Sequence, residues 1–203
     1  MAMNVFSRTR GIILKPKGEW VKIKDEPLPF SKLFSSYVLN LAFIPAAVQF
    51  LRYSLVGFKL PYHGWYRFGI GMAFLRAVLV YALILGSVYL LGLVINALTP
   101  SFSSSRNLSS AMNLAAYGLT PLWLGSVFYL IPFLGRLDIV VGLYGIYILY
   151  LGFATPLGDG PKAKTTVSLI SLLISVVAAG LLLAVLWVVL DTIFMVGRVS
   201  RLI

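Results

Sequence analysis

The chain of 203 residues has no cysteine, one histidine and only six acidic residues. Without cysteine it has no disulfide, no thiolate metal ligand and no thiol nucleophile. The lone histidine, His63, has no second histidine or carboxylate near it in the sequence, whereas a metal site needs several ligands. The sequence also has no glycine-rich phosphate loop, nucleophile elbow or zinc-protease motif. We therefore expect no cofactor, no metal and no catalysis.

Charged residues are also scarce: they make up 11% of the chain, against about 25% in an ordinary soluble domain. Because backbone groups cannot go unsatisfied in lipid, an apolar chain without β alternation crosses a bilayer as helices. A hydrocarbon core of about 30 Å needs roughly 20 residues of helix. Five stretches are long enough, and they predict spans at about 33–51, 72–98, 111–131, 137–153 and 165–190.

The predicted fold is thus all-α, a polytopic integral membrane protein whose residues 33–203 form a bundle of five transmembrane helices. Residues 1–32 precede the bundle and hold seven basic and three acidic residues. Apolar residues alternate there with basic ones at loose helical spacing, and Pro16-Lys17-Gly18 divides the segment into two pieces. We expect an amphipathic segment that lies in the interface with its apolar side towards lipid.

The formal net charge of +11 has its simplest explanation at the membrane surface. The basic residues cluster in the N-terminal segment and at span ends, where anionic lipid headgroups attract them. We therefore expect anionic lipids, and no nucleic acid, as partners. The basic N-terminal segment favours an N-terminus on the cytoplasmic side.

A few polar residues lie within or between the predicted spans, and each allows two interpretations. Arg76 falls inside the second apolar stretch, where a charge either serves a function or extends its head to the surface. The tyrosines of the fourth span share one broad face, which lines a polar cavity or hydrogen-bonds to other helices. A charged pair between spans three and four stands at a pore mouth or caps a tight turn. These candidates are Arg76, Arg136, Asp138, Tyr144, Tyr147 and Tyr150.

Spans three and four carry residues suited to close helix packing. Pro121 removes a backbone donor in the middle of the third span and predicts a kink. Gly118, one turn earlier, lets another helix approach that weakened turn. We expect the kink to pack against the fourth span through Gly142 and Gly145.

Three stretches of this region resemble the Yip family, multispanning proteins first known as partners of Ypt/Rab GTPases. They are Ala116-Tyr-Gly-Leu-Thr-Pro-Leu122, Leu130-Ile-Pro-Phe-Leu-Gly135, which holds Pro132, and Gly142-Leu-Tyr-Gly-Ile-Tyr-Ile-Leu-Tyr-Leu-Gly152. The most specific positions are Tyr117, Gly118 and Pro121. The resemblance implies five spans, a cytosolic N-terminus, an exported C-terminus and no known catalysis.

The opening Ile12-Ile-Leu-Lys-Pro-Lys-Gly-Glu-Trp20 resembles the prokaryotic branch of this family, which implies a cytoplasmic (inner) membrane. Eukaryotic relatives have a longer N-terminal region with an Asp-Leu-Tyr-Gly-Pro type motif. This chain lacks that motif, so a small GTPase is not an expected partner.

Two functions remain open from the sequence. The first is a non-enzymatic protein that organises membranes, in a scaffolding or trafficking-like role, through its spans, its N-terminal segment and contacts with a second copy or other membrane proteins. The alternative is a small transporter or channel component with a cavity lined by Arg76, Tyr117 and the tyrosines of the fourth span. A polar cavity would favour the transporter, whereas a dry bundle packed through small residues would favour the scaffold.

Overall fold

The computed structural model describes residues 4–26, 28–60, 64–98, 108–131, 133–135 and 137–154, and the isolated positions 180, 185, 188–190, 192 and 194. Most of the described chain is helical. In order, the elements are α1 (Val5–Leu14), α2 (Pro16–Asp25), α3 (Phe30–Leu33), η1 (Phe34–Val38), α4 (Leu39–Leu51), η2 (Arg52–Val56), β1 (Phe58–Leu60), β2 (Gly64–Tyr66), α5 (Ile70–Leu98), α6 (Leu108–Gly125), η4 (Ser126–Leu130) and α7 (Leu137–Ala154).

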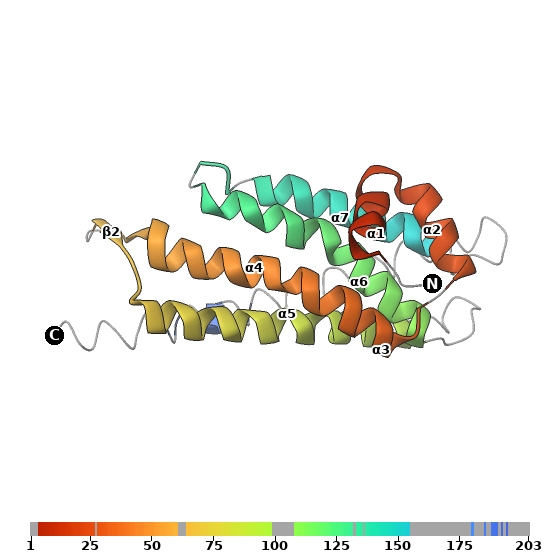
Figure 1. The fold of residues 1–203 in the computed structure, drawn as a ribbon, viewed down its shortest axis with the longest axis horizontal. Coiled ribbons are helices and arrows are strands. Elements are labelled where there is room, and N and C mark those ends of the chain that lie inside the picture. Colours follow the sequence, from red (N-terminus) through yellow and green to blue (C-terminus); the bar gives the residue numbers. More distant parts are fainter. Residues whose placement is uncertain are drawn as a thin grey trace.

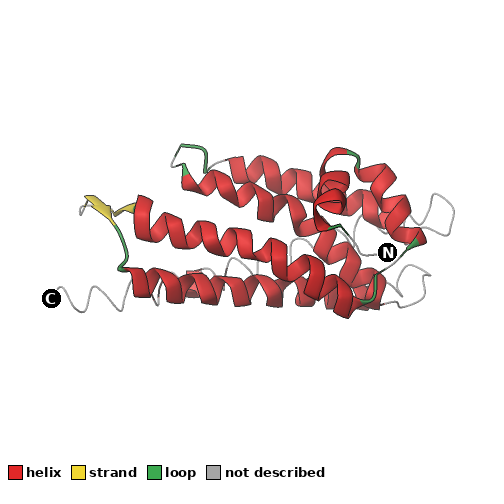
Figure 2. Cartoon of the chain, in the orientation of Figure 1, coloured by secondary structure: helices red, strands yellow, loops and turns green. Residues whose placement is uncertain are grey.

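The long helices form a bundle with α6 between α5 and α7 (Figure 1). Helices α4 and α5 lie side by side, and α6 and α7 form a second pair above them (Figure 2). The continuous helix Phe30–Val56 and the helix Ile70–Ala97 are long and apolar enough to cross a membrane, and Ile139–Phe153 is a shorter apolar helix. The isolated described positions between 180 and 194, which belong to the predicted fifth span and its end, are also helical; the rest of that span lies outside the described residues.

The helix expected at 33–51 begins earlier, with α3, and ends later, because the wider turn η2 extends it after α4. Segments η1 and η2 are π-helical turns before and after α4. Pro45 lies within α4, where it cannot donate a backbone hydrogen bond. Side chains supply further bonds along this helix: Asn40 Nδ2 donates to Ser36 O at 2.8 Å, and Ser54 Oγ donates to Phe50 O at 2.7 Å.

A short antiparallel β hairpin, which the all-α prediction did not include, joins η2 to α5. Strands β1 and β2 have three residues each, with Phe58 opposite Tyr66. Gly57 ends η2 with a φ of 83°, a left-handed conformation that favours glycine. Aromatic rings gather behind the hairpin, where Tyr53 stacks on Phe68 with centroids 5.2 Å apart. Phe58 and Tyr66 of the two strands also contact Phe68, so these rings form one aromatic cluster.

Helix α6 is the most deeply buried helix of the bundle, and small residues let its neighbours approach. Every residue from 111 to 118 is buried. Met112 of α6 occupies the space that a side chain at Gly92 of α5 would fill, and Leu149 of α7 does the same at Gly118. The third span, expected as one helix over 111–131, changes at Gly125 from α-helix to the 3-10 helix η4.

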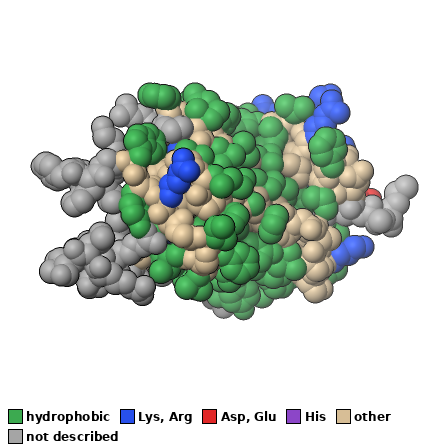
Figure 3. All heavy atoms as spheres, turned by 60° about the vertical axis from the view of Figure 1, so that its left-hand side comes forward, with side chains coloured by type: hydrophobic (Ala, Val, Ile, Leu, Met, Phe, Trp, Pro, Cys, Tyr) green, Lys and Arg blue, Asp and Glu red, His purple; other side chains and the backbone are tan. Residues whose placement is uncertain are grey.

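The outside of the bundle is an apolar belt. In Figure 3 hydrophobic side chains cover the middle of the molecule, and Lys and Arg lie towards its two ends. Large exposed hydrophobic residues occur on all the long helices, among them Phe43, Phe74, Leu122 and Ile139. A soluble monomer rarely exposes so much contiguous apolar surface, so the belt is the surface expected to contact lipid.

We expect Gly118→Leu to lower the thermal stability of the detergent-solubilised protein. The added side chain would collide with Leu149, and overpacking of a tight contact costs about 1–3 kcal/mol. Gly86→Leu is the control, because no atom lies within 4 Å of a Cβ placed there. Equal melting temperatures for the two variants would contradict the close approach of α6 and α7.

Candidate functional site

The most elaborate contact in the described chain is made by the N-terminal hairpin, the pair of helices α1 and α2 over Val5–Asp25. Asn4 caps α1, its Oδ1 accepting a hydrogen bond from Ser7 N at 3.3 Å. Pro16 stands in the first turn of α2, where a missing N–H costs nothing, so the two helices separate at Lys15. The hairpin sits near the end of the bundle where α6 begins and α7 ends (Figure 1).

Trp20 anchors the hairpin between α6 and α7. Its side chain is 0% exposed, and Nε1–H donates to the backbone carbonyl of Ile148 at 3.0 Å. The indole meets the Tyr117 ring edge-on, with centroids 6.0 Å apart. Gly152 creates the space, because a Cβ atom there would lie 2.6 Å from Cζ2 of Trp20. We call this place the Trp20 slot.

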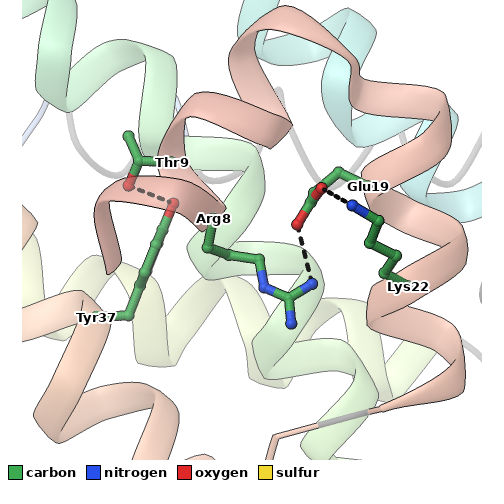
Figure 4. A network of polar contacts seen from close by, with 5 residues as sticks. All are labelled: Arg8, Thr9, Glu19, Lys22 and Tyr37. Carbon is green, nitrogen blue, oxygen red and sulfur yellow. Dashed lines mark hydrogen bonds and ion pairs between the residues drawn. The ribbon is translucent and has the colours of Figure 1, made fainter. Parts of the chain in front are cut away.

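Tyr37 joins the hairpin to α6 through its hydroxyl group. The hydroxyl lies 2.9 Å from Thr120 Oγ1 of α6. It also accepts a hydrogen bond from Thr9 Oγ1 of α1 at 3.5 Å (Figure 4). The Tyr37 ring also packs on the Tyr117 ring, with centroids 4.8 Å apart. One buried hydroxyl thus links three separate helices.

Three further hydrogen bonds attach the N-terminal segment to the bundle. The hydroxyl of Tyr144 donates to Ile13 O of α1 at 2.6 Å. The carbonyl of Leu28, which follows α2, accepts from Ser109 Oγ and Asn113 Nδ2 of α6, both at 2.9 Å. The hairpin and the linker behind it are therefore fixed to α6 and α7 at several points.

Glu19 is buried and pairs with one largely buried cation, Arg8, and with one exposed cation, Lys22. Its carboxylate lies 3.0 Å from Arg8 Nη1 and 3.4 Å from Lys22 Nζ (Figure 4). Gly11 makes room for it, since a side chain at that position would overlap the carboxylate. Because ionised groups away from water need partners, this network removes unpaired charge from the hairpin's inner side.

The outer side of the hairpin combines cations with exposed apolar side chains. On α1, Phe6, Arg10 and Leu14 are exposed, whereas Thr9 and Ile12 are buried. On α2 the exposed residues are Lys17, Gly18, Val21, Lys22, Lys24 and Asp25. The apolar residues that the sequence assigned to lipid are thus divided between the bundle and the outer surface.

The family-motif residues lie at or beside this contact. Tyr117 is buried between Trp20 and Tyr37, and Pro121 is buried in α6. A Cβ atom at Gly145 would lie 3.3 Å from Gly118 O, and one at Gly142 would lie 3.8 Å from Leu122 Cδ2. Pro132 lies outside the described residues.

The candidate cavity residues are not brought together. Arg76 is buried, with its guanidinium carbon 4.3 Å from the Tyr53 ring centroid and Nη2 3.3 Å from the Tyr53 hydroxyl. Tyr144 lies on the other side of α6 and contacts the N-terminal hairpin and Tyr147. Tyr147 is exposed and Tyr150 packs at the edge of the core. Arg136 and the Asp138 side chain lie outside the described part of the chain.

The central residues of this contact, Trp20, Tyr37 and Thr120, were missed from the sequence. A tryptophan within a basic amphipathic segment commonly lies at the membrane interface. Its spacing in the sequence does not tell whether protein or lipid surrounds the indole. Among the described residues, no group of three His, Asp or Glu side chains is placed to hold a metal ion.

The model of the Yip1 domain matches residues 10–196. The chain belongs to the Yip1 domain family. The resemblance found at Tyr117, Gly118 and Pro121 is confirmed, and this Yip1-domain chain is a membrane protein.

Two curated relatives of this Yip1-domain chain carry the name "Inner membrane protein YohC", from Escherichia coli strain K12 and from E. coli O6:H1. Each is 27% identical over 187 residues, which cover 89% of this chain and 96% of the relative. No solved structure matches the chain.

We expect Gly152→Ala to destabilise the Yip1-domain fold, because the new methyl group would overlap Trp20 and Leu114 in the Trp20 slot. Gly142→Ala on the same helix is the matched control, since its methyl group would make only an ordinary contact with Leu122. In an open helical position, alanine is favoured over glycine by about 1 kcal/mol. Thermal melting in detergent should therefore move in opposite directions for the two variants, and a rise for both would contradict the slot.

Proposed function

We propose that this chain is a non-enzymatic, multi-pass membrane protein that organises membranes, in a scaffolding or trafficking-like role, through contacts between helices and contacts with lipid. One observation carries the proposal: the N-terminal hairpin docks on α6 and α7 through its buried side while Arg10, Lys17 and Lys24 remain exposed on its outer side. This arrangement suits a protein whose partners are neighbouring helices and lipid headgroups.

In this proposal residues 33–203 form five spans, at about 33–51, 72–98, 111–131, 137–153 and 165–190. Residues 1–32 form the basic segment at the cytoplasmic surface. The basic N-terminal segment supports this orientation. The names of the E. coli relatives support placement in a prokaryotic inner membrane.

The proposed partners are anionic lipids at the N-terminal hairpin and, along the apolar belt, a second copy or other membrane proteins. A small GTPase is not included, because the eukaryotic Asp-Leu-Tyr-Gly-Pro type motif is missing. The transporter alternative required Arg76 and the α7 tyrosines to share a cavity, whereas they make separate contacts. The close approach at Gly92 and Gly118 supports the scaffold instead.

We expect the hairpin to concentrate anionic lipid around it. A donor dye on Glu26→Cys, in this Cys-free chain, should transfer more energy to a headgroup-labelled anionic lipid than to a neutral one. Each nearby cation contributes about 1 kcal/mol, and screening acts within about 10 Å at 0.1 M salt and 3 Å at 1 M. High salt or the triple change Arg10→Gln, Lys17→Gln and Lys24→Gln should remove the preference.

The control for this measurement is a donor on Arg67→Cys, beside β2, which reports on lipid at the other end of the bundle. A preference that is equally strong at both ends, or that survives the triple change, would remove anionic lipid from the proposed function.

We expect the N-terminus to be cytoplasmic, which single cysteines at Ser7 and Arg67 can test in cells. An impermeant thiol reagent should label Arg67→Cys on intact cells and should reach Ser7→Cys only after permeabilisation. Both positions are exposed in the fold, so accessibility reports the side of the membrane. The opposite pattern would reverse the topology.

A further inference from the structure

The described part of the molecule is wider at one end than at the other. Figure 1 shows the N-terminal hairpin beside the end of the bundle where α6 begins, with α1 viewed nearly end-on and therefore crossing the bundle axis. At the other end, the described residues add only β1 and β2, of three residues each. Two extra helices thus lie at one end of the bundle.

The outer face of α1 has the pattern of a helix that enters an interface. Phe6, Arg10 and Leu14 are spaced four residues apart and share one side of the helix. Phe6 is 76% exposed and Leu14 is 64% exposed, although both are large and apolar. Lys17 and Val21 repeat the combination on α2 with the same spacing.

The inner face of the hairpin cannot enter a membrane interface, because it is already packed against the bundle. Trp20 and Ile12 are fully buried against the bundle, and Tyr37 and Tyr144 hydrogen-bond to α1. The hairpin therefore stays attached while its outer face contacts another surface. A lipid bilayer suits this face, because cations alternate on it with apolar side chains.

We propose that this chain is a one-sided wedge that favours anionic bilayers curved to be convex on the side of the N-terminal hairpin. The inference rests on the proposed function in one respect: the hairpin lies at a membrane surface. Apolar side chains of an interfacial helix enter about 5–10 Å into the boundary between headgroups and acyl chains, and such binding depends on curvature. Because the hairpin enters one leaflet only, it expands that leaflet, and convex curvature relieves the crowding.

The test uses two single-cysteine proteins, Glu26→Cys beside the hairpin and Arg67→Cys at the other end. Each is reconstituted in giant vesicles that contain anionic lipid, and an impermeant dye is added outside. The dye labels only the copies whose cysteine faces outwards, so each sample reports on one orientation of the protein in the membrane. Narrow tubes are pulled outwards from the vesicles. The ratio of protein to lipid signal in the tube is divided by the same ratio in the vesicle. This quotient measures how strongly the labelled protein is enriched in the curved tube.

The wedge predicts a quotient above one for the dye on Glu26→Cys, because those hairpins lie in the convex outer leaflet. It predicts a quotient below one for Arg67→Cys, because those hairpins lie in the concave inner leaflet. Equal quotients for the two proteins would overturn the proposal and would leave the outer face to a protein partner.

The double change Phe6→Ser and Leu14→Ser tests the residues directly. Both quotients should move to one, while thermal stability stays near that of the parent because both side chains point away from the core. The exchange Phe6→Leu with Leu14→Phe keeps the apolar surface and should keep the sorting. Sorting that persists in the serine variant would overturn the assignment to this face.

The outcome is separable from that of the proposed function. A preserved preference for anionic lipid together with equal quotients would remove the wedge alone. Opposite quotients without a preference for anionic lipid would keep the convex wedge but overturn its restriction to anionic bilayers. The same result would remove anionic lipid from the partners in the proposed function.

Discussion

The close approach of α6 to its neighbours is the constraint on which the rest of the structure depends. Helices in lipid associate without a hydrophobic driving force, so they rely on packing that small residues permit. Here Met112 packs against Gly92, Leu149 packs against Gly118 and Trp20 packs against Gly152. The first two contacts join α6 to both neighbouring helices, and the third adds the N-terminal hairpin to the same packed unit.

The polar contacts then determine how the hairpin is oriented on that unit. A buried donor without a partner costs about 1–3 kcal/mol, so the hydroxyl and indole groups favour the positions where they are satisfied. Trp20 donates a hydrogen bond to a backbone carbonyl of α7, and the Tyr37 hydroxyl is hydrogen-bonded to Thr9 and Thr120. Apolar contact alone would let the hairpin slide, whereas these directional bonds specify one orientation.

The sequence predicted the elements better than the contacts between them. Scarce charge marks long apolar helices, and the Tyr117-Gly118 motif indicates both the family and a tightly packed place. Helical spacing places Trp20 and Ile23 on one side of α2, but it does not tell whether lipid or protein covers that side. Arg76 and Tyr144 were grouped because both are polar groups within spans; in three dimensions α6 separates the helices that carry them.

The placement of acidic residues explains how one hairpin can bind on two sides at once. No acidic residue occurs between Glu26 and Asp138, so α4, α5 and α6 offer the hairpin no carboxylate. Glu19 instead supplies a carboxylate from within the hairpin, and this carboxylate pairs with Arg8 and Lys22. The inner side can then be buried without unpaired charge, and exposed cations such as Arg10 and Lys17 remain on the outer side. Docking and attraction to lipid therefore use different faces, and neither weakens the other.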